Sequence, residues 1–458
     1  MTLSEPDSNE MRQIETLFTN LDKPFSIEEC IEKLKSSTDV EDFSIDELQN
    51  KIETEINKKN GYLLEMADEK FISKKKFEEH KKNLSKNVLR EIKKQGFTIN
   101  EDKTIKQPNM NSKQAVRNFH ASACADRYYK NIDFIEKNQN KLIRYFANGE
   151  DININKFEPA VQKIEPDTKQ WKLFKFCTFL WSVPISKGFG RRTRFLVWDK
   201  NNAKIVGLFA LGDPVFNLSA RDELIGWNQE MKKKRLYNVM DIFILGAVPP
   251  YNTLLGGKLV AMIAATNEVR NVIYNKYKKS KTVILQEEKN PSLALLTTSS
   301  ALGKSSIYDR IRFNNRVLYK RIGKSKGWGH FHLNHGLYED MLHFLSWIDP
   351  SAVDSNRFGQ GPNWKIRTAK KALYYLDLPT NLLRHGIQRE IYAIPLAKNY
   401  IKYLVGKNDE LDLYDMPFKD VTQFWKKRWL FGRAKRKPEY KYYDKEDTLK
   451  QIHKWGNK

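Results

Sequence analysis

The pattern of hydrophobic and polar positions divides the chain into a helical first part, a strand-rich middle part and a helical last part. In the middle part, residues 204–211 and 240–245 are short apolar runs bounded by turn residues, which is typical of buried strands. Residues 174–181 and 193–198 are rich in aromatic and β-branched side chains, a composition that also favours strands. The pattern therefore predicts an α+β core with a mixed sheet over residues 171–335.

The first 80 residues show the order of a winged-helix-like domain. Helical spacing over residues 11–56 predicts three helices, two of which begin at Ser26 and Ser44, each with a glutamate three positions later. A predicted hairpin follows and would form the wing. The third helix is acidic, so a protein contact is as consistent with it as DNA reading. Residues 81–170 are expected to form a helical linker region, and residues 336–458 a helical, basic C-terminal region.

A glycine pair separates the predicted strand at 240–245 from the helix that follows it. At Gly256 and Gly257 the backbone can approach a ligand without obstruction by a Cβ atom, and Lys258 follows directly. Unpaired N–H groups at a helix N-terminus attract anions, so this turn is a candidate cofactor-binding cradle. Close packing of helix against strand is an equally good explanation of the two glycines.

Charge is the strongest global property of the sequence. The chain has 458 residues, a net charge of +24 and a hydrophobic content of 40%, which is ample for a folded core. Residues 1–75 carry 18 acidic and 10 basic side chains, a net of −8, so the rest of the chain carries +32. Such an excess favours a polyanionic partner, with nucleic acid and DNA in particular as the first candidate. A basic protein without such a partner is the alternative.

The spacing of the cysteines and the lengths of the apolar runs indicate the cellular compartment in which the protein is expected. Cys30, Cys124 and Cys177 are far apart in sequence, which argues against a disulfide scaffold and suits a reducing cytoplasm. No run approaches the roughly 20 apolar residues of a membrane-spanning helix. We therefore expect a cytoplasmic protein that does not contact a membrane.

Three groups of residues are candidates for nucleic-acid binding. Arg191, Arg192 and Arg194 follow two glycines on a predicted hairpin, where arginine side chains can bind phosphate oxygens. The Gly-Lys-Ser-Ser stretch lacks the first glycine of a P-loop, so it suggests phosphate contact rather than ATP hydrolysis. Its candidate residues are Lys304, Ser305 and Ser306. The third group lies in the aromatic and basic C-terminal stretch and comprises Lys426, Lys427, Arg428, Arg433, Lys435 and Arg436.

Each group also has a plain structural interpretation. Arginines can lie on a solvated strand edge, where they oppose aggregation. The Lys304 stretch can cap a helix, and the C-terminal stretch can pack on its own domain with the aliphatic stems of its cations buried.

Acidic and histidine side chains suggest further chemistry. Asp213, Asp222 and Asp241 are candidate catalytic groups, because converging carboxylates can hold Mg²⁺ for phosphodiester cleavage. The alternatives are a turn role for Asp213, pairing with the preceding arginine for Asp222 and a strand start for Asp241. His330 and His332 would share one face of a strand, but structural or nucleic-acid contact is favoured over a metal site.

Several long strings in the chain resemble the DUF4338 family, the family of the Druantia anti-phage protein DruA. One is Gly327-Trp-Gly-His-Phe-His332, and the other strings fall at residues 181–196, 211–216, 221–227, 246–261, 297–308, 361–364 and 383–390. Together they cover roughly residues 110–435 and leave the N-terminal segment outside. The resemblance implies a role in bacterial defence against phage DNA, with other proteins of the defence system as further partners. It implies no particular reaction.

A second resemblance lies within the same core. The strand, the turn around Gly256 and the following helix resemble the acyl-CoA-binding turn of GCN5-related N-acetyltransferases (GNAT). With Gly256 aligned on the first glycine of that turn, Thr253 stands where glutamine or arginine is usual, and Lys258 where glycine or alanine is usual. Tyr308 falls on the superfamily's tyrosine, which often protonates the leaving thiolate, while Arg312 replaces the glycine of that signature.

We thus expect a DNA-interacting component of a DruA-like defence system with a GNAT-like core and no identified cofactor. A nucleic-acid-modifying group-transfer enzyme that uses Tyr308 is one alternative. A Mg²⁺-dependent nuclease that uses the three aspartates is the other.

Overall fold

The computed structural model describes residues 74–94, 96–101, 105–106, 112–183, 185, 190–282, 286–300, 302–327, 335–350, 353 and 364–456. The chain divides into two compact units, Met1–His80 and Lys81–Lys458. The expected winged-helix-like segment over residues 11–75 lies almost wholly outside the described residues, as do His330 and His332. The account below concerns the second unit.

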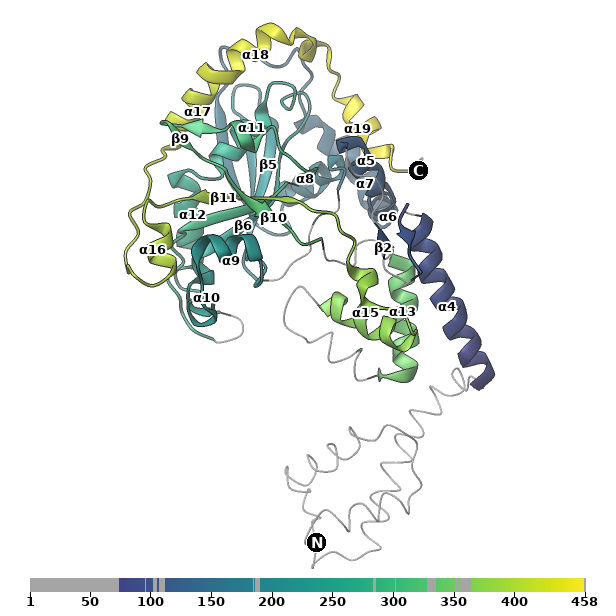
Figure 1. Cartoon of the computed structure of the whole chain (residues 1–458). Coiled ribbons are helices and arrows are strands. Elements are labelled where there is room, and N and C mark those ends of the chain that lie inside the picture. The colour runs from purple at the N-terminus through teal and green to yellow at the C-terminus, as the bar shows by residue number, and fades with distance from the viewer. Residues whose placement is uncertain are drawn as a thin grey trace, which may run out of the picture. The chain divides into compact units, whose positions relative to one another are not determined.

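A seven-stranded mixed sheet forms the centre of this unit (Figure 1). In spatial order its strands are β10 (Lys320–Lys324), β11 (Glu390–Pro395), β7 (Leu295–Ser299), β6 (Val239–Ala247), β5 (Lys204–Gly212), β4 (Arg192–Asp199) and β3 (Pro159–Ile164). Every neighbouring pair is antiparallel except β6 and β7, which are parallel. The predicted α+β class with a mixed sheet is confirmed. Two of the strands, β3 and β11, come from outside residues 171–335.

The parallel pair at the centre of the sheet is short. β6 pairs with β7 only over Val239–Asp241, although β6 has nine residues. Phe243 has no partner on β5, because Leu211 and Ala210 pair with the residues on either side of it, which is the arrangement of a β-bulge. Beyond the bulge, residues 245–247 of β6 are partly exposed. The two strands therefore separate just after Asp241.

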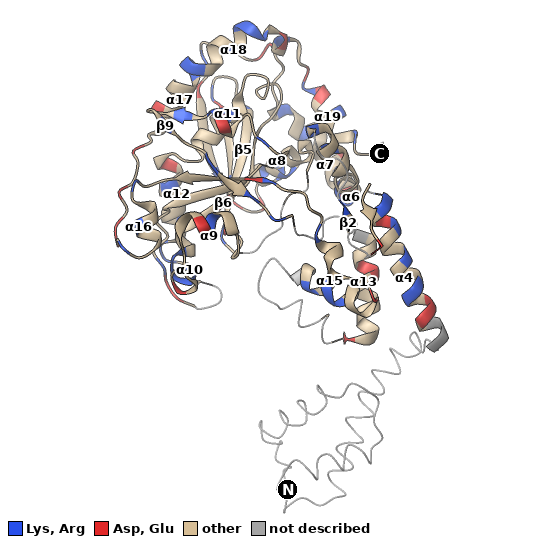
Figure 2. Cartoon of the chain, viewed as in Figure 1, with Lys and Arg blue, Asp and Glu red and all other residues tan. Residues whose placement is uncertain are grey.

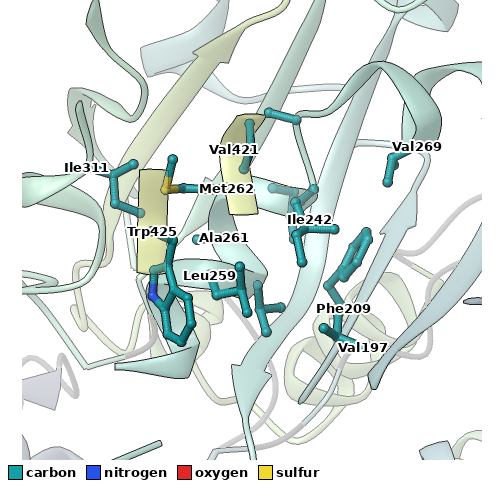
Figure 3. Close-up of a cluster of buried hydrophobic side chains, with 14 of the residues drawn as sticks. Val197, Phe209, Ile242, Leu259, Ala261, Met262, Val269, Ile311, Val421 and Trp425 are labelled. Carbon is teal, nitrogen blue, oxygen red and sulfur yellow. The ribbon is translucent and has the colours of Figure 1, made fainter. Parts of the chain in front are cut away.

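Alternation along the strands divides the core into two clusters on opposite sides of the sheet. In β5, Phe209 and Leu211 belong to one cluster and Leu208 and Ala210 to the other, as the two-residue period of a strand requires. The first cluster is covered by α11 (Gly256–Ile263), α12 (Asn267–Tyr277) and α17 (Phe418–Trp425) (Figure 3). The second is covered by α6 (Ala121–Tyr129), α7 (Ile132–Leu142), α8 (Lys169–Cys177) and α19 (Glu446–His453).

A third cluster of buried side chains lies at the β7–β11 part of the sheet, where Val239, Leu295 and Ala393 pack against helices. The helices in this region are α9 (Ser219–Ile225), α10 (Gln229–Arg235) and α16 (Tyr400–Leu404).

The other described elements are shorter or lie away from the sheet. The helices are α4 (Lys74–Lys94), α5 (Lys113–Phe119), α13 (His335–Ile348), α15 (Trp364–Tyr375) and α18 (Phe431–Arg436), and the strands are β1 (Thr98–Ile99), β2 (Ile105–Lys106), β8 (Arg312–Phe313) and β9 (Arg316–Val317). The single-turn segments are η1 (Ile143–Tyr145), η2 (Thr178–Leu180), η3 (Leu236–Asn238), η4 (Tyr308–Arg310), η5 (Thr380–Leu383), η6 (Lys426–Leu430, a π-helix) and η7 (Pro438–Tyr442).

Several elements differ from the sequence-based expectation. Strand β3 lies in residues 81–170, which were expected to be helical. Residues 174–181 are not a strand: residues 174–180 belong to α8 and η2, and Trp181 follows η2. Thr168 caps α8 by accepting a hydrogen bond from the Trp171 amide at 3.2 Å. Strand β11 lies in a part of the chain expected to be helical. All six of its residues are buried, so it has no polar alternation that would mark it as a strand.

Candidate functional site

A row of polar residues crosses the sheet at the point where β6 and β7 separate. Arg192 on β4 is paired with Gly212 on β5, Gly212 with Asp241 on β6, and Asp241 with Thr297 on β7. The Thr297 hydroxyl donates a hydrogen bond to Asp241 Oδ1 at 3.0 Å. Burial raises the pKa of Asp241 to about 6, against the opposing effects of the Thr297 hydrogen bond and of Arg221 and Arg192. Asp241 is thus a carboxyl group that changes protonation near neutral pH.

Tyr308 is buried among aromatic rings in the first cluster, which also contains Ile242 and Leu296. Its ring stacks on Tyr319 with centroids 4.8 Å apart and meets the edge of Tyr392 at 5.1 Å. Burial raises the pKa of Tyr308 to about 12; a Thr298 hydrogen bond acts to lower it, and the charge of Asp241 acts to raise it further. Met240 and Ile242, the neighbours of Asp241 on β6, belong to the same buried cluster as Tyr308, so the Asp241 side chain lies on the opposite face of the sheet. The structure therefore places Tyr308 and Asp241 on different faces, and they interact through charge rather than contact.

Asp213 is engaged by Arg191, which lies one position before Arg192. Its Oδ2 accepts a hydrogen bond from the Arg191 backbone amide at 2.8 Å, and its Oδ1 accepts one from Arg191 Nε at 2.8 Å. The arginine side chain is 7% exposed, lies over the Tyr237 ring at 3.6 Å and donates to the Tyr237 carbonyl at 2.7 Å. These contacts fix the start of β4 and the end of β5 to each other.

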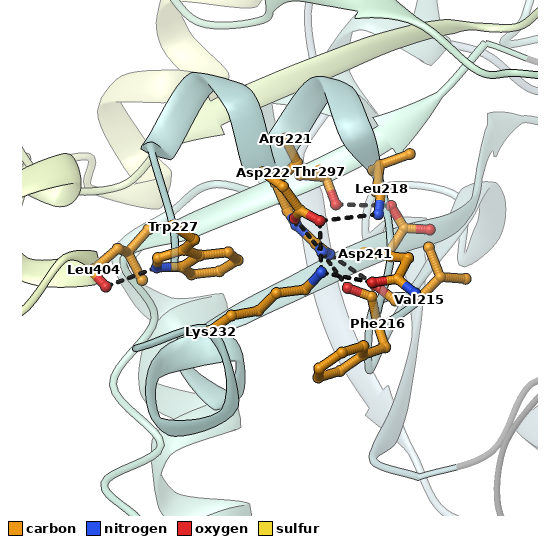
Figure 4. A network of polar contacts seen from close by, with 11 residues as sticks. Val215, Phe216, Leu218, Arg221, Asp222, Trp227, Lys232, Asp241, Thr297 and Leu404 are labelled. Carbon is orange, nitrogen blue, oxygen red and sulfur yellow. Dashed lines mark hydrogen bonds and ion pairs between the residues drawn. The ribbon is translucent and has the colours of Figure 1, made fainter. Parts of the chain in front are cut away.

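Asp222 lies between two buried cations, as Figure 4 shows. Its Oδ1 accepts from Arg221 Nη2 at 2.6 Å, and its Oδ2 accepts from Lys232 Nζ at 2.7 Å. The same arginine donates to the carbonyls of Val215 at 2.8 Å and Phe216 at 2.7 Å. Asp222 thereby completes a charge network that holds the loop between β5 and α9. In the described ranges no three His, Cys, Asp or Glu side chains gather as a group that could hold a metal ion.

The glycine turn is closely packed by the chain itself. A Cβ atom at Gly256 would lie 2.8 Å from the Tyr251 carbonyl oxygen, and one at Gly257 would lie 3.1 Å from Ile307 Cδ1. Lys258 is buried, and its Nζ donates to the carbonyls of Ser306 at 3.1 Å and Ile307 at 3.0 Å. Burial, aided by the charge of Arg310, lowers the pKa of Lys258 to about 8. The space next to the two glycines is therefore filled by the protein's own residues, such as Tyr251 and Ile307.

The remaining candidates upstream of residue 310 are partly buried or exposed. Arg192 lies over the Phe243 ring at 4.0 Å and Arg194 over the Trp171 ring at 4.0 Å. Burial, with repulsion from Arg192, lowers the pKa of Arg194 to about 10. Lys304 and Ser306 are exposed, whereas the Ser305 hydroxyl accepts a hydrogen bond from the Tyr308 amide at 3.3 Å. Ser305 thus positions the turn that carries Tyr308.

The C-terminal cations divide into two sets. Lys426 Nζ donates to the Phe157 carbonyl at 2.6 Å and Arg433 Nε to the Thr253 carbonyl at 2.8 Å, so both anchor the segment. Trp425 is fully buried and donates to the Leu255 carbonyl at 3.2 Å. The other four cations are exposed along η6 and α18 (Figure 2) and form what we call the C-terminal basic surface: Lys427, Arg428, Lys435 and Arg436.

Thr297, Thr298 and the cations of α15 were not singled out from the sequence. The two threonines occurred only within one of the strings of the family resemblance. A row across a sheet depends on strand order and register, which the sequence pattern does not give. The sequence shows that α15 is basic, but it does not show which residues of the helix are exposed.

The fold and these residues define a basic α+β protein with a seven-stranded mixed sheet, exposed cations and a partly buried carboxyl group, Asp241, at the centre of the sheet. Among the helices that the structure describes, none is long and apolar enough to cross a membrane. Residues 110–406 match the family described as Druantia protein DruA. The Druantia protein DruA of Escherichia coli (strain UMEA 4076-1) is 40% identical over 367 residues, which are 80% of this chain and 91% of that protein. The chain belongs to the DruA family. No solved structure matches it.

Proposed function

We propose that this chain is a DNA-binding component of an anti-phage defence system. Membership of the DruA family supports a role in anti-phage defence. The charge of +24, with a net negative charge over residues 1–75, makes a polyanion the expected partner of the remaining chain. DNA is the polyanion that such a defence protein would meet on an invading phage genome.

The observation that carries this proposal is the C-terminal basic surface. Lys427, Arg428, Lys435 and Arg436 are exposed on a segment whose buried side, with Trp425 and Leu430 fully buried, belongs to the core. A cation on a fixed backbone loses less conformational freedom on binding phosphate than one on a mobile tail. The surface is therefore suited to contact a phosphate backbone without reading its sequence.

The test is a salt titration of DNA binding. Each phosphate contact adds roughly −0.9 to the slope of log K against log salt for duplex DNA. Replacing the four surface cations by alanine should therefore lower the affinity at low salt and make the slope less negative by about 3 to 4. A control variant changes Lys233, Lys234, Lys278 and Lys279 to alanine, and these four residues are exposed on or beside other helices. It has the same net charge as the variant of the C-terminal basic surface. Affinity of the unaltered protein that does not respond to salt would refute DNA binding.

A second candidate is a group-transfer enzyme that modifies nucleic acid. The observation that favours it is Asp241, a carboxyl group whose pKa is raised to about 6 at the point where β6 leaves β7. Asp241 could accept the proton of an attacking nucleophile. The order of strand β6, glycine turn and helix α11 supports a GNAT-like core, whereas the packing around Gly256 and Lys258 leaves the turn occupied by the chain.

Native mass spectrometry of the purified full chain tests this second candidate. A small molecule retained by the protein and lost from a variant with Tyr308→Phe and Asp241→Asn would support it. If the unaltered protein and the variant retain the small molecule equally, the molecule binds at a site that does not include Tyr308 or Asp241.

A further inference from the structure

Helix α15 has an unusual charge composition. Its sequence, Trp-Lys-Ile-Arg-Thr-Ala-Lys-Lys-Ala-Leu-Tyr-Tyr, contains four cations and no acidic residue. Figure 2 shows blue along the described part of this helix. Helices on protein surfaces usually mix charges of both signs, because opposite charges three or four residues apart stabilise the helix. The sequence of α15 therefore offers no opposite charge within the helix, and Lys371 pairs instead with Asp349 beyond α13.

The two faces of α15 are cleanly separated. One face is wholly buried and consists of Thr368, Ala369, Ala372 and Leu373. Exposed side chains stand at positions i, i+3, i+4 and i+7 of the opposite face, and they are Arg367, Lys370, Lys371 and Tyr374. Tyr374 is 71% exposed, which is high for an aromatic side chain. We call these four residues the α15 outer face.

Contacts to two neighbouring helices hold α15 in place. On one side it packs against α13, and Lys371 Nζ lies 2.6 Å from Asp349 Oδ2 just beyond that helix. At its C-terminal end, Ser85 Oγ of α4 donates to the Leu376 carbonyl at 3.0 Å. Lys81 of α4 also pairs with Asp377 at 2.8 Å. The outer face is thus presented on a helix whose position is fixed by the rest of the fold.

We propose that α15 lies in the major groove of duplex DNA, with its outer face toward the DNA. This inference rests on the proposed DNA-binding function and adds a second contact surface and a preference for duplex. An α-helix with its side chains is roughly 10–12 Å across, and the major groove of B-DNA is about 12 Å wide. Arg367 and Lys370 contact phosphates along the groove, while Tyr374 contacts the base edges at its floor.

The experiment compares duplex and single-stranded DNA of equal length by fluorescence anisotropy, with the full chain and three variants. Arg367→Ala combined with Lys370→Ala should weaken duplex binding about tenfold at low salt and make the slope less negative by about 2. Tyr374→Ala should weaken duplex binding several-fold without changing the slope, because it removes no charge. Lys233→Ala combined with Lys234→Ala removes the same charge from α10 and should match the unaltered protein. Thermal unfolding of all variants shows that each remains folded.

Two results would overturn the inference. One is an α15 double variant that binds duplex as tightly as the α10 control. The other is an equal loss on duplex and single-stranded DNA, because contact in a groove requires a duplex. The first result, together with lost binding in the variant of the C-terminal basic surface, would reject the role of α15 and leave the proposed function standing. An unaltered protein whose affinity does not respond to salt would reject both.

Discussion

The carboxylates of Asp213, Asp222 and Asp241 share a residue type but have different surroundings. Asp213 pairs with Arg191, and Asp222 pairs with Arg221 and Lys232, so each compensates a cation whose side chain is at least nine-tenths buried. Removing either carboxylate would leave a buried charge without its partner, which is strongly destabilising. Asp241 has the Thr297 hydroxyl as its hydrogen-bond donor, and Arg192 and Arg221 act on it only through their charge. Its surroundings make Asp241 the most suitable of the three for proton transfer.

The raised pKa of Asp241 predicts a pH-dependent effect on stability. The folded-state pKa of about 6 exceeds the unfolded value near 3.8, so the native state binds more protons between these values and stability falls as pH rises through them. Asp241→Asn removes that fall. The variant should therefore gain stability relative to the unaltered protein, on the order of 1 to 3 kcal/mol at pH 7 and little at pH 4, with the lower end favoured by the partial exposure of the residue.

Urea unfolding of both proteins at pH 4 and pH 7 measures this difference. The asparagine side chain of the variant keeps an oxygen that can accept the Thr297 hydrogen bond, so the comparison isolates the charge. The same difference at both pH values would show that the Asp241 carboxyl group has an ordinary pKa, and the argument for proton transfer by Asp241 would then fail.

At the scale of elements, the glycine turn before α11 has two explanations that a single substitution separates. Gly256→Ala places a Cβ atom 2.8 Å from the Tyr251 carbonyl oxygen and 3.0 Å from Ala247 Cβ. If the glycine serves packing, the variant should lose about 1 to 3 kcal/mol of unfolding free energy. Gly432→Ala in α18 is the control, because its Cβ would meet only the flexible end of Arg436, so a small gain is expected.

Chemical denaturation measures both variants. Unchanged stability of Gly256→Ala together with loss of a bound small molecule would instead make the turn a ligand cradle. The packing explanation would then be wrong.

The elements that the sequence predicted well are those with a clear period. Residues 204–211 and 240–245 fall within β5 and β6, because each is an apolar run ended by turn residues. Helix α15 lies in the region over residues 336–458 that was expected to be helical, and its apolar positions recur every three to four residues. Strand β11 was missed because a strand buried on both faces shows no alternation. The sequence could not predict that Asp241 lies beside Thr297, since this depends on the order and register of the strands.

At the scale of the whole molecule, the two compact units carry opposite charge. Residues 1–75, nearly all of the first unit, have a net charge of −8, and the rest of the chain has +32. An acidic segment joined in sequence to a basic unit can act in two ways. It can repel phosphate and weaken DNA binding, or it can contribute specific contacts, as a winged-helix domain would.

Removal of residues 1–73 decides between these two effects. Helix α4 begins at Lys74, so the shortened chain keeps every element of the second unit. If the segment acts only through its charge, the shortened protein should bind duplex DNA several-fold more tightly at low salt, and the gain should vanish as salt screens the repulsion. The measurement is anisotropy of both proteins across a range of salt concentrations. Weaker binding by the shortened protein at all salt concentrations would show that the N-terminal unit itself contacts DNA, and the acidic third predicted helix would then not prevent that contact.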